Sequence, residues 1–175
     1  MNSSTLESLN KILSPDRIRD NLAIKISEIL TETIEDPSIK CEAEIEVDPA
    51  IVALFIKTKR KALSSNYFRK IFFKTKLEIN FYIYALMLVD KLLSNKSINL
   101  THQNAENIYY ACLLISIKIL SDKIRDNETY AEYSKLTLKV MNQMEYSILT
   151  LLNFETFLSE KLFLHYEEYI LEILD

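Results

Sequence analysis

The sequence predicts an all-α fold. Its 175 residues include no glycine and only three prolines, Pro15, Pro37 and Pro49. Sheet proteins of this size use glycine in hairpin turns and bulges, and nucleotide-binding loops use it to approach phosphate, so both classes are excluded. Apolar residues recur at helical spacing, and the length suits one domain with its own core. We therefore expect helix ends finished by Asn, Ser, Thr and Asp.

The first 61 residues are expected to hold a tail, two helices and a connector. Residues 1–15 are polar and read as a flexible tail that ends at Ser14-Pro15. Apolar positions at helical spacing predict a helix from Asp16 to about Glu35, which Pro37 ends. Residues 37–48 form an acidic connector, and Pro49 can occupy the first turn of a helix that runs through Phe55.

The second part of the chain is more densely apolar. Its pattern predicts a short helix that holds Phe68, Ile71 and Phe72, and five further segments. These are Leu77–Leu93, a helix from an N-cap at Thr101 to Leu120, short helical material at Tyr130–Tyr133, Leu138–Leu152 with Thr137 as its cap, and an amphipathic helix at Leu158–Leu174.

Several functional classes find no support in the sequence. The longest apolar runs, Phe81–Val89 and Ile108–Ile117, are about half the roughly 20 residues that a membrane span requires. No basic-then-apolar signal segment opens the chain. The two cysteines and two histidines form no metal-ligand spacing or catalytic motif, and the cysteines fit a reducing compartment. We expect a soluble protein of the nucleus or cytoplasm that is not an enzyme and has no cofactor, metal site or catalytic residue.

The net charge of −4 hides a strong asymmetry. The stretch from Pro49 to Leu77 holds eight basic residues and no acidic residue, so the remainder of the chain carries −12. These basic residues are Lys57, Lys59, Arg60, Lys61, Arg69, Lys70, Lys74 and Lys76. A basic stripe can bind nucleic acid, but the acidic balance of the chain favours a solvated face or attraction of an acidic protein partner.

One charge lies on the apolar side of each of three long predicted helices: Asp90, Lys118 and Glu145. Lys118 is the most informative, because it follows the apolar run Ile108–Ile117 and lysine is almost never fully buried without a partner. Either these residues are boundary charges whose long side chains reach solvent, or a partner outside the domain covers them and supplies their hydrogen bonds.

The order and spacing of these residues resemble the cyclin box. The pattern comprises Val89-Asp90-Lys91-Leu92-Leu93, Ala111 to Lys118, Asp122, Asn127, Tyr130-Ala131, Leu136-Thr137, Met141-Asn142, Glu145 and Asn153-Phe154. The resemblance covers roughly residues 62–170 and is greatest to compact, single-box cyclins of the P and U types. It implies a single five-helix box at 62–155, preceded by N-terminal helices and the acidic connector at 16–61 and followed by a C-terminal amphipathic helix at 156–175.

The resemblance also implies roles for single residues. In cyclins the third box helix carries a lysine and the fifth a glutamate that reach a cyclin-dependent kinase, and Lys118 and Glu145 match these positions. An aspartate on the second box helix pairs internally with an arginine on the first. Asp90 matches the aspartate, while Lys70, with Arg69 beside it, stands at the arginine position. Since lysine cannot make the bidentate contact of arginine, Arg69 is an alternative partner for Asp90.

The implied function is that of a non-catalytic regulatory subunit. It would form a heterodimer with a cyclin-dependent kinase and activate it by docking on the regulatory helix of the kinase, as in control of the cell cycle. The alternative is a cyclin-fold adaptor or transcription-factor-like interaction module without a kinase partner. Those proteins usually carry two boxes and, for binding DNA, a basic surface, whereas this chain has room for one box and is acidic.

Overall fold

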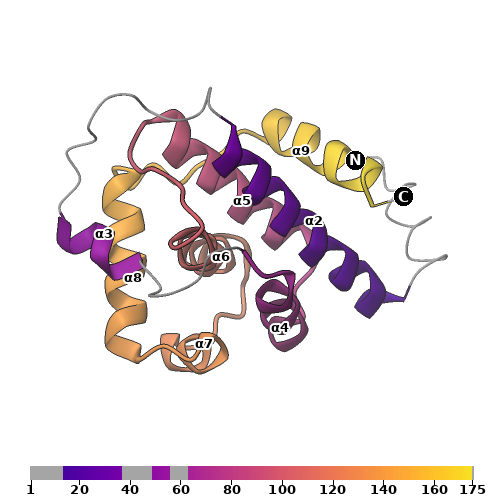
Figure 1. Ribbon diagram of the computed structural model, residues 1–175. Helices are drawn as coiled ribbons and strands as arrows, with labels where there is room; N and C mark the ends of the chain where they lie inside the picture. The colour runs from indigo at the N-terminus through magenta and orange to yellow at the C-terminus, as the bar shows by residue number, and fades with distance from the viewer. Residues whose placement is uncertain (1–13, 37–48, 56–62, 175) are drawn as a thin grey trace.

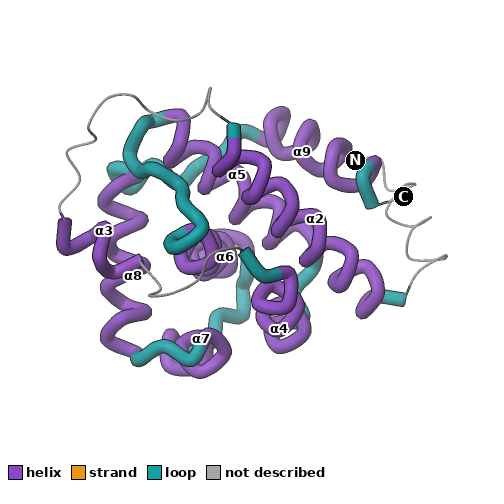
Figure 2. The backbone as a smooth tube through the Cα atoms, in the orientation of Figure 1, coloured by secondary structure: helices purple, strands orange, loops and turns teal. Residues whose placement is uncertain are grey.

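The protein is all-helical throughout the residues that the computed structural model describes, which are 14–36, 49–55 and 63–174. Eight helices and no strand occur in these ranges (Figures 1 and 2). None of these helices is both long enough and apolar enough to cross a membrane. The helices are α2 (Pro15–Glu35), α3 (Pro49–Phe55), α4 (Ser65–Thr75), α5 (Ile79–Ser94), α6 (Ala105–Leu120), α7 (Asn127–Ser134), α8 (Leu138–Leu151) and α9 (Glu160–Glu172).

Helix α6 forms the centre of the core. Every residue from Ala105 to Ile117 is buried, because the sequence of this helix is apolar nearly all round. Helix α5 packs along it, and α8 and α3 contact it from another side (Figure 1). The five helices α4 to α8 correspond in number and order to the predicted box, and the all-α prediction is confirmed.

The other helices cover the outside of this core. Helix α2 packs on α4, and α9 packs on α5 with Ile170 buried. The predicted helices at Asp16–Glu35, Leu77–Leu93 and Leu158–Leu174 are therefore present, with ends shifted by one or two residues. The acidic connector 37–48 and the basic residues Lys57, Lys59, Arg60 and Lys61 lie outside the described residues.

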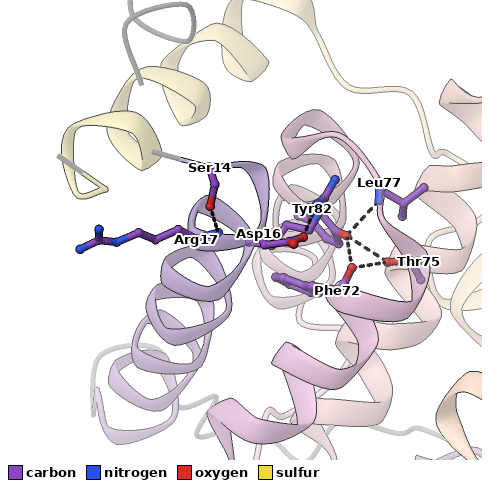
Figure 3. Close-up of polar contacts among 8 residues, drawn as sticks. Ser14, Asp16, Arg17, Phe72, Thr75, Leu77 and Tyr82 are labelled. Carbon is purple, nitrogen blue, oxygen red and sulfur yellow. Dashed lines mark hydrogen bonds and ion pairs between the residues drawn. The ribbon is translucent and has the colours of Figure 1, made fainter. Parts of the chain in front are cut away.

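A buried tyrosine fixes the junction between α4 and α5 (Figure 3). The hydroxyl of Tyr82 lies 2.9 Å from the hydroxyl of Thr75 and accepts a hydrogen bond from the amide of Leu77 at 3.3 Å. It also lies 3.4 Å from the carbonyl oxygen of Phe72, to which it can donate. Burial raises the pKa of Tyr82. The end of α4 is thereby held against the start of α5.

Side-chain caps begin several helices, as the sequence predicts. Ser14 accepts a hydrogen bond from the amide of Arg17 at 3.4 Å (Figure 3), and Thr137 accepts one from the amide of Val140 at 3.3 Å. Because Ser14 caps α2 and Pro15 is its first residue, the predicted tail extends two residues too far. Residues 1–13 lie outside the described part.

The predicted N-cap at Thr101 is wrong. The N-cap is Asn104, three residues later, and α6 begins at Ala105. The side-chain oxygen of Asn104 accepts a hydrogen bond from the amide of Thr101 at 2.8 Å, and its side-chain nitrogen donates to the carbonyl of Asn99 at 2.9 Å. This local network stabilises a turn in place of the first helical turn.

The C-terminal ends of α4 and α7 also differ from expectation. Each is followed by a lysine in the left-handed region, Lys76 with φ 50° and Lys135 with φ 60°. A third lysine, Lys96, has φ 52° after α5. This conformation is usually taken by glycine, or less often by asparagine. In a chain without glycine, lysine takes it at these three positions.

Candidate protein-docking site

Lys118 and Glu145 meet at the end of the central helix. Lys118 lies in the last turn of α6, and Glu145 lies in the middle of α8. The ammonium nitrogen of Lys118 is 2.6 Å from Oε1 of Glu145. The lysine side chain is 32% exposed and that of the glutamate 15%, so the ion pair lies at the border between core and solvent. The resemblance assigned both residues to the same kinase contact, and the structure brings the two side chains together.

The second carboxylate oxygen of Glu145 is held by an amide. The side-chain nitrogen of Asn127 lies 2.8 Å from Oε2 of Glu145 and 2.7 Å from the side-chain oxygen of Asn142. Asn127 is the first residue of α7, whose start is fixed because Asp126 accepts a hydrogen bond from the amide of Thr129 at 3.0 Å. Both oxygens of Glu145 are therefore occupied. The sequence pattern contained Asn127 and Asn142, but it gave them no role.

The ammonium group of Lys118 retains donors for another acceptor. It carries three N–H groups, and in the part of the chain that the structure describes its hydrogen-bond partner is Glu145. Large apolar side chains near it in the chain are exposed, namely Ile119, Leu120 and Ile124, and α8 exposes Leu138 and Tyr146. We call Lys118, Glu145 and these five apolar residues the docking surface. A polar centre with an apolar surround is typical of the anchors of protein interfaces.

The predicted internal pair of Asp90 is not formed. Oδ2 of Asp90 accepts a short hydrogen bond from the hydroxyl of Tyr166 on α9. Arg69 instead contacts Asp20 of α2, with Nε 2.6 Å from Oδ1. Lys70 is exposed and makes no ion pair with any described residue. The added helices α2 and α9 supply both partners, so neither contact could be read from the box alone.

Burial changes the acidity of both members of the Asp90–Tyr166 contact. The pKa of Asp90 is raised because desolvation disfavours its charged form, and the hydrogen bond from Tyr166 offsets part of this effect. The pKa of Tyr166 is raised by its own burial and by the neighbouring carboxylate. This contact fixes α9 to α5 and is structural.

Other reactive side chains do not assemble into a chemical site in the described ranges. Among residues 14–36, 49–55 and 63–174, no group of three or more His, Cys, Asp or Glu residues is placed to hold a metal ion. Cys112 is fully buried in α6, and burial raises the pKa of its thiol far above the ordinary value. The docking surface is therefore the strongest candidate for function in these residues.

Comparison with known proteins identifies the family. The family described as "Cyclin, N-terminal domain" matches residues 42–157, which is more than half of the chain. The chain belongs to the cyclin family. It is also similar to Cyclin-P1-1 of Oryza sativa subsp. japonica, with 28% identity over 95 residues. That match covers 54% of this chain and 36% of the rice protein. Cyclins are in general regulatory proteins without catalytic groups of their own, and this chain is a cyclin-like regulator.

Proposed function

We propose that this cyclin binds a cyclin-dependent protein kinase through the docking surface and activates it. The observation that carries the proposal is the partly exposed ion pair between Lys118 and Glu145 at 2.6 Å, with exposed apolar side chains on α8 and at the end of α6. By the resemblance of the sequence to the cyclin box, these two residues match the positions at which cyclins contact the kinase. The free N–H groups of Lys118 would donate to backbone carbonyl groups next to the regulatory helix of the kinase.

The regulator contributes binding energy and no catalytic group. An active kinase needs an ion pair between a strand lysine and a glutamate of its regulatory helix. A partner that binds this helix only in its inward position shifts the kinase towards the active state. Reversing a 99:1 bias towards the inactive state takes about 5.5 kcal/mol of differential affinity, which a few apolar anchors around one desolvated charge can supply. In this proposal the protein is a non-catalytic subunit of the nucleus or cytoplasm.

Affinity capture tests the proposal directly. The tagged chain is used to capture partners from an extract of its native cells, and the eluate is assayed for protein kinase activity. We expect Lys118→Ala and Glu145→Ala to reduce the recovered activity about tenfold or more, as is typical when a central interface residue is truncated. Lys161→Ala serves as the matched control, since Lys161 is exposed on α9.

Two outcomes would contradict the proposal. Recovery of polymerase components or DNA without kinase activity would favour an adaptor role for the same fold. Loss of the helical circular dichroism signal in either variant would show that the pair is needed for folding, and the assignment of the docking surface would then lose its support.

A further inference from the structure

Helix α4 carries a second exposed surface that the docking surface does not include. Its inner face is buried through Phe68, Ile71 and Phe72, but Phe73 is 60% exposed. Phe73 lies on a groove of about 410 Å³ between α4 and α2. An isolated exposed apolar side chain is common, so the argument depends on the charges around this one.

Three lysines surround Phe73 and are not neutralised by any described residue. Lys70, Lys74 and Lys76 are exposed and make no ion pair within the described ranges. The ammonium group of Lys76 lies 5.7 Å from the centre of the Phe73 ring, and that of Lys74 lies 5.6 Å from the centre of the Tyr133 ring. We call Phe73 and these three lysines the α4 surface.

The acidic residues that line the groove do not cancel this charge. Asp16 pairs with Arg19 at 3.0 Å, and Asp20 pairs with Arg69 at 2.6 Å. Each of these two carboxylates thus has an arginine partner. The α4 surface keeps its positive charge although the chain as a whole carries −4.

We propose that the α4 surface binds an acidic peptide segment of a partner protein, in which aspartate or glutamate residues flank a large apolar side chain. The apolar side chain would lie against Phe73 in the groove, and the carboxylates would contact the lysines. A nucleic acid fits less well, because it carries charge far beyond the contact and the acidic remainder of this chain would repel it. A short acidic segment need cover only the basic patch.

Helix α7 places this surface close to the docking surface. The first residue of α7, Asn127, contacts Glu145, while Tyr133 near its other end accepts a hydrogen bond from Lys74 through its backbone carbonyl at 3.3 Å. An eight-residue helix is about 12 Å long. A protein docked on α4 would therefore lie beside a kinase bound at Lys118. The binding itself requires no kinase, so it can fail independently of the proposed function.

Peptide binding to the isolated full chain tests the inference. The probe is a fluorescein-labelled peptide in which Leu-Phe is flanked by three glutamates on each side, and the comparison peptide has glutamine in place of every glutamate. We expect saturable binding of the acidic probe by fluorescence polarisation. Phe73→Ala and Lys70→Glu should each weaken it about tenfold, while Lys161→Glu, which makes the same change in charge on α9, should change it less than twofold.

Several results would overturn the inference. Equal loss of affinity in Lys70→Glu and Lys161→Glu would mean that the attraction is nonspecific, and equal binding of the glutamine peptide would remove the role of the lysines. Competition by a single-stranded oligonucleotide at the same concentration as unlabelled peptide would indicate a nucleic-acid site. Binding that appears only after Glu42, Glu44, Glu46 and Asp48 are neutralised would identify the chain's own connector as the occupant. Circular dichroism and thermal unfolding verify that each variant is folded.

Discussion

The Lys118–Glu145 pair allows a quantitative test of what each charge contributes to folding. At 2.6 Å, the Coulomb attraction is about 2 to 6 kcal/mol for effective dielectric constants of 80 to 20. Most of this is offset by loss of hydration, and partial exposure weakens it further. Lys118→Met leaves a largely buried carboxylate with Asn127 as its donor, and we expect a loss of about 2 kcal/mol in the free energy of unfolding. Glu145→Gln leaves the more exposed ammonium in contact with water, and a loss of about 1 kcal/mol is expected.

The double variant distinguishes pairing from independent contributions. With both charges removed, no charge is left unpaired, and we expect a total loss of about 1 kcal/mol, which gives a coupling energy of about 2 kcal/mol. Urea unfolding followed by circular dichroism at pH 7 measures all four proteins. Additive losses in the double variant would refute the reasoning. If the double variant regains stability but still captures no kinase, the pair contributes to binding beyond its role in folding.

Three further predictions concern the interior and the helix ends. Asp90→Asn removes a carboxyl whose pKa is raised in the folded state above 3.8. The wild type should therefore lose stability relative to this variant as pH rises from about 4 through the folded pKa, and the difference in the free energy of unfolding should be constant at higher pH. Urea unfolding of both proteins from pH 4 to 7.5 measures this difference. A difference that does not change with pH would contradict the prediction. In a Cys41→Ser background, the buried thiol of Cys112 should react with a maleimide only when urea unfolds the chain, and rapid labelling of the native protein would show that it is accessible. Thr137→Ala should lower the free energy of unfolding by about 1 kcal/mol through loss of the α8 cap, as measured by thermal and urea unfolding, whereas Thr137→Ser should retain most of the stability.

The fold was largely predictable because it depends on local patterns. The apolar periodicity located the helices, and the uninterrupted apolar run up to Ile117 indicated which helix lies at the centre. Thr137 caps α8 as expected, but Thr101 does not cap α6, because the amide of Asn104, which its hydroxyl would have to accept, donates to the backbone carbonyl of Thr101 instead. Whether a side chain or a backbone carbonyl accepts a given amide depends on local geometry that sequence spacing does not contain.

The site was predictable in part. The resemblance pointed to Lys118 and Glu145 as the charged residues of the site, and the structure shows that they pair and adds Asn127 as the donor to the second oxygen. The partner of Asp90 was not predictable, since Tyr166 lies 76 residues away on a helix outside the box. Roles of single residues in kinase binding, and the domain boundaries, remain predictions.

The three lysines at left-handed positions have a consequence for the stability of the whole fold. A residue with a Cβ atom pays about 1 kcal/mol more than glycine in this conformation. Attraction between the lysine charge and the exposed carbonyl groups of a helix end returns only a few tenths of a kcal/mol when the side chain is in solvent. The protein is thus less stable than its own topology permits, and the difference arises after α4, α5 and α7, and again after α8, where Asn153 and Phe154 also take this conformation.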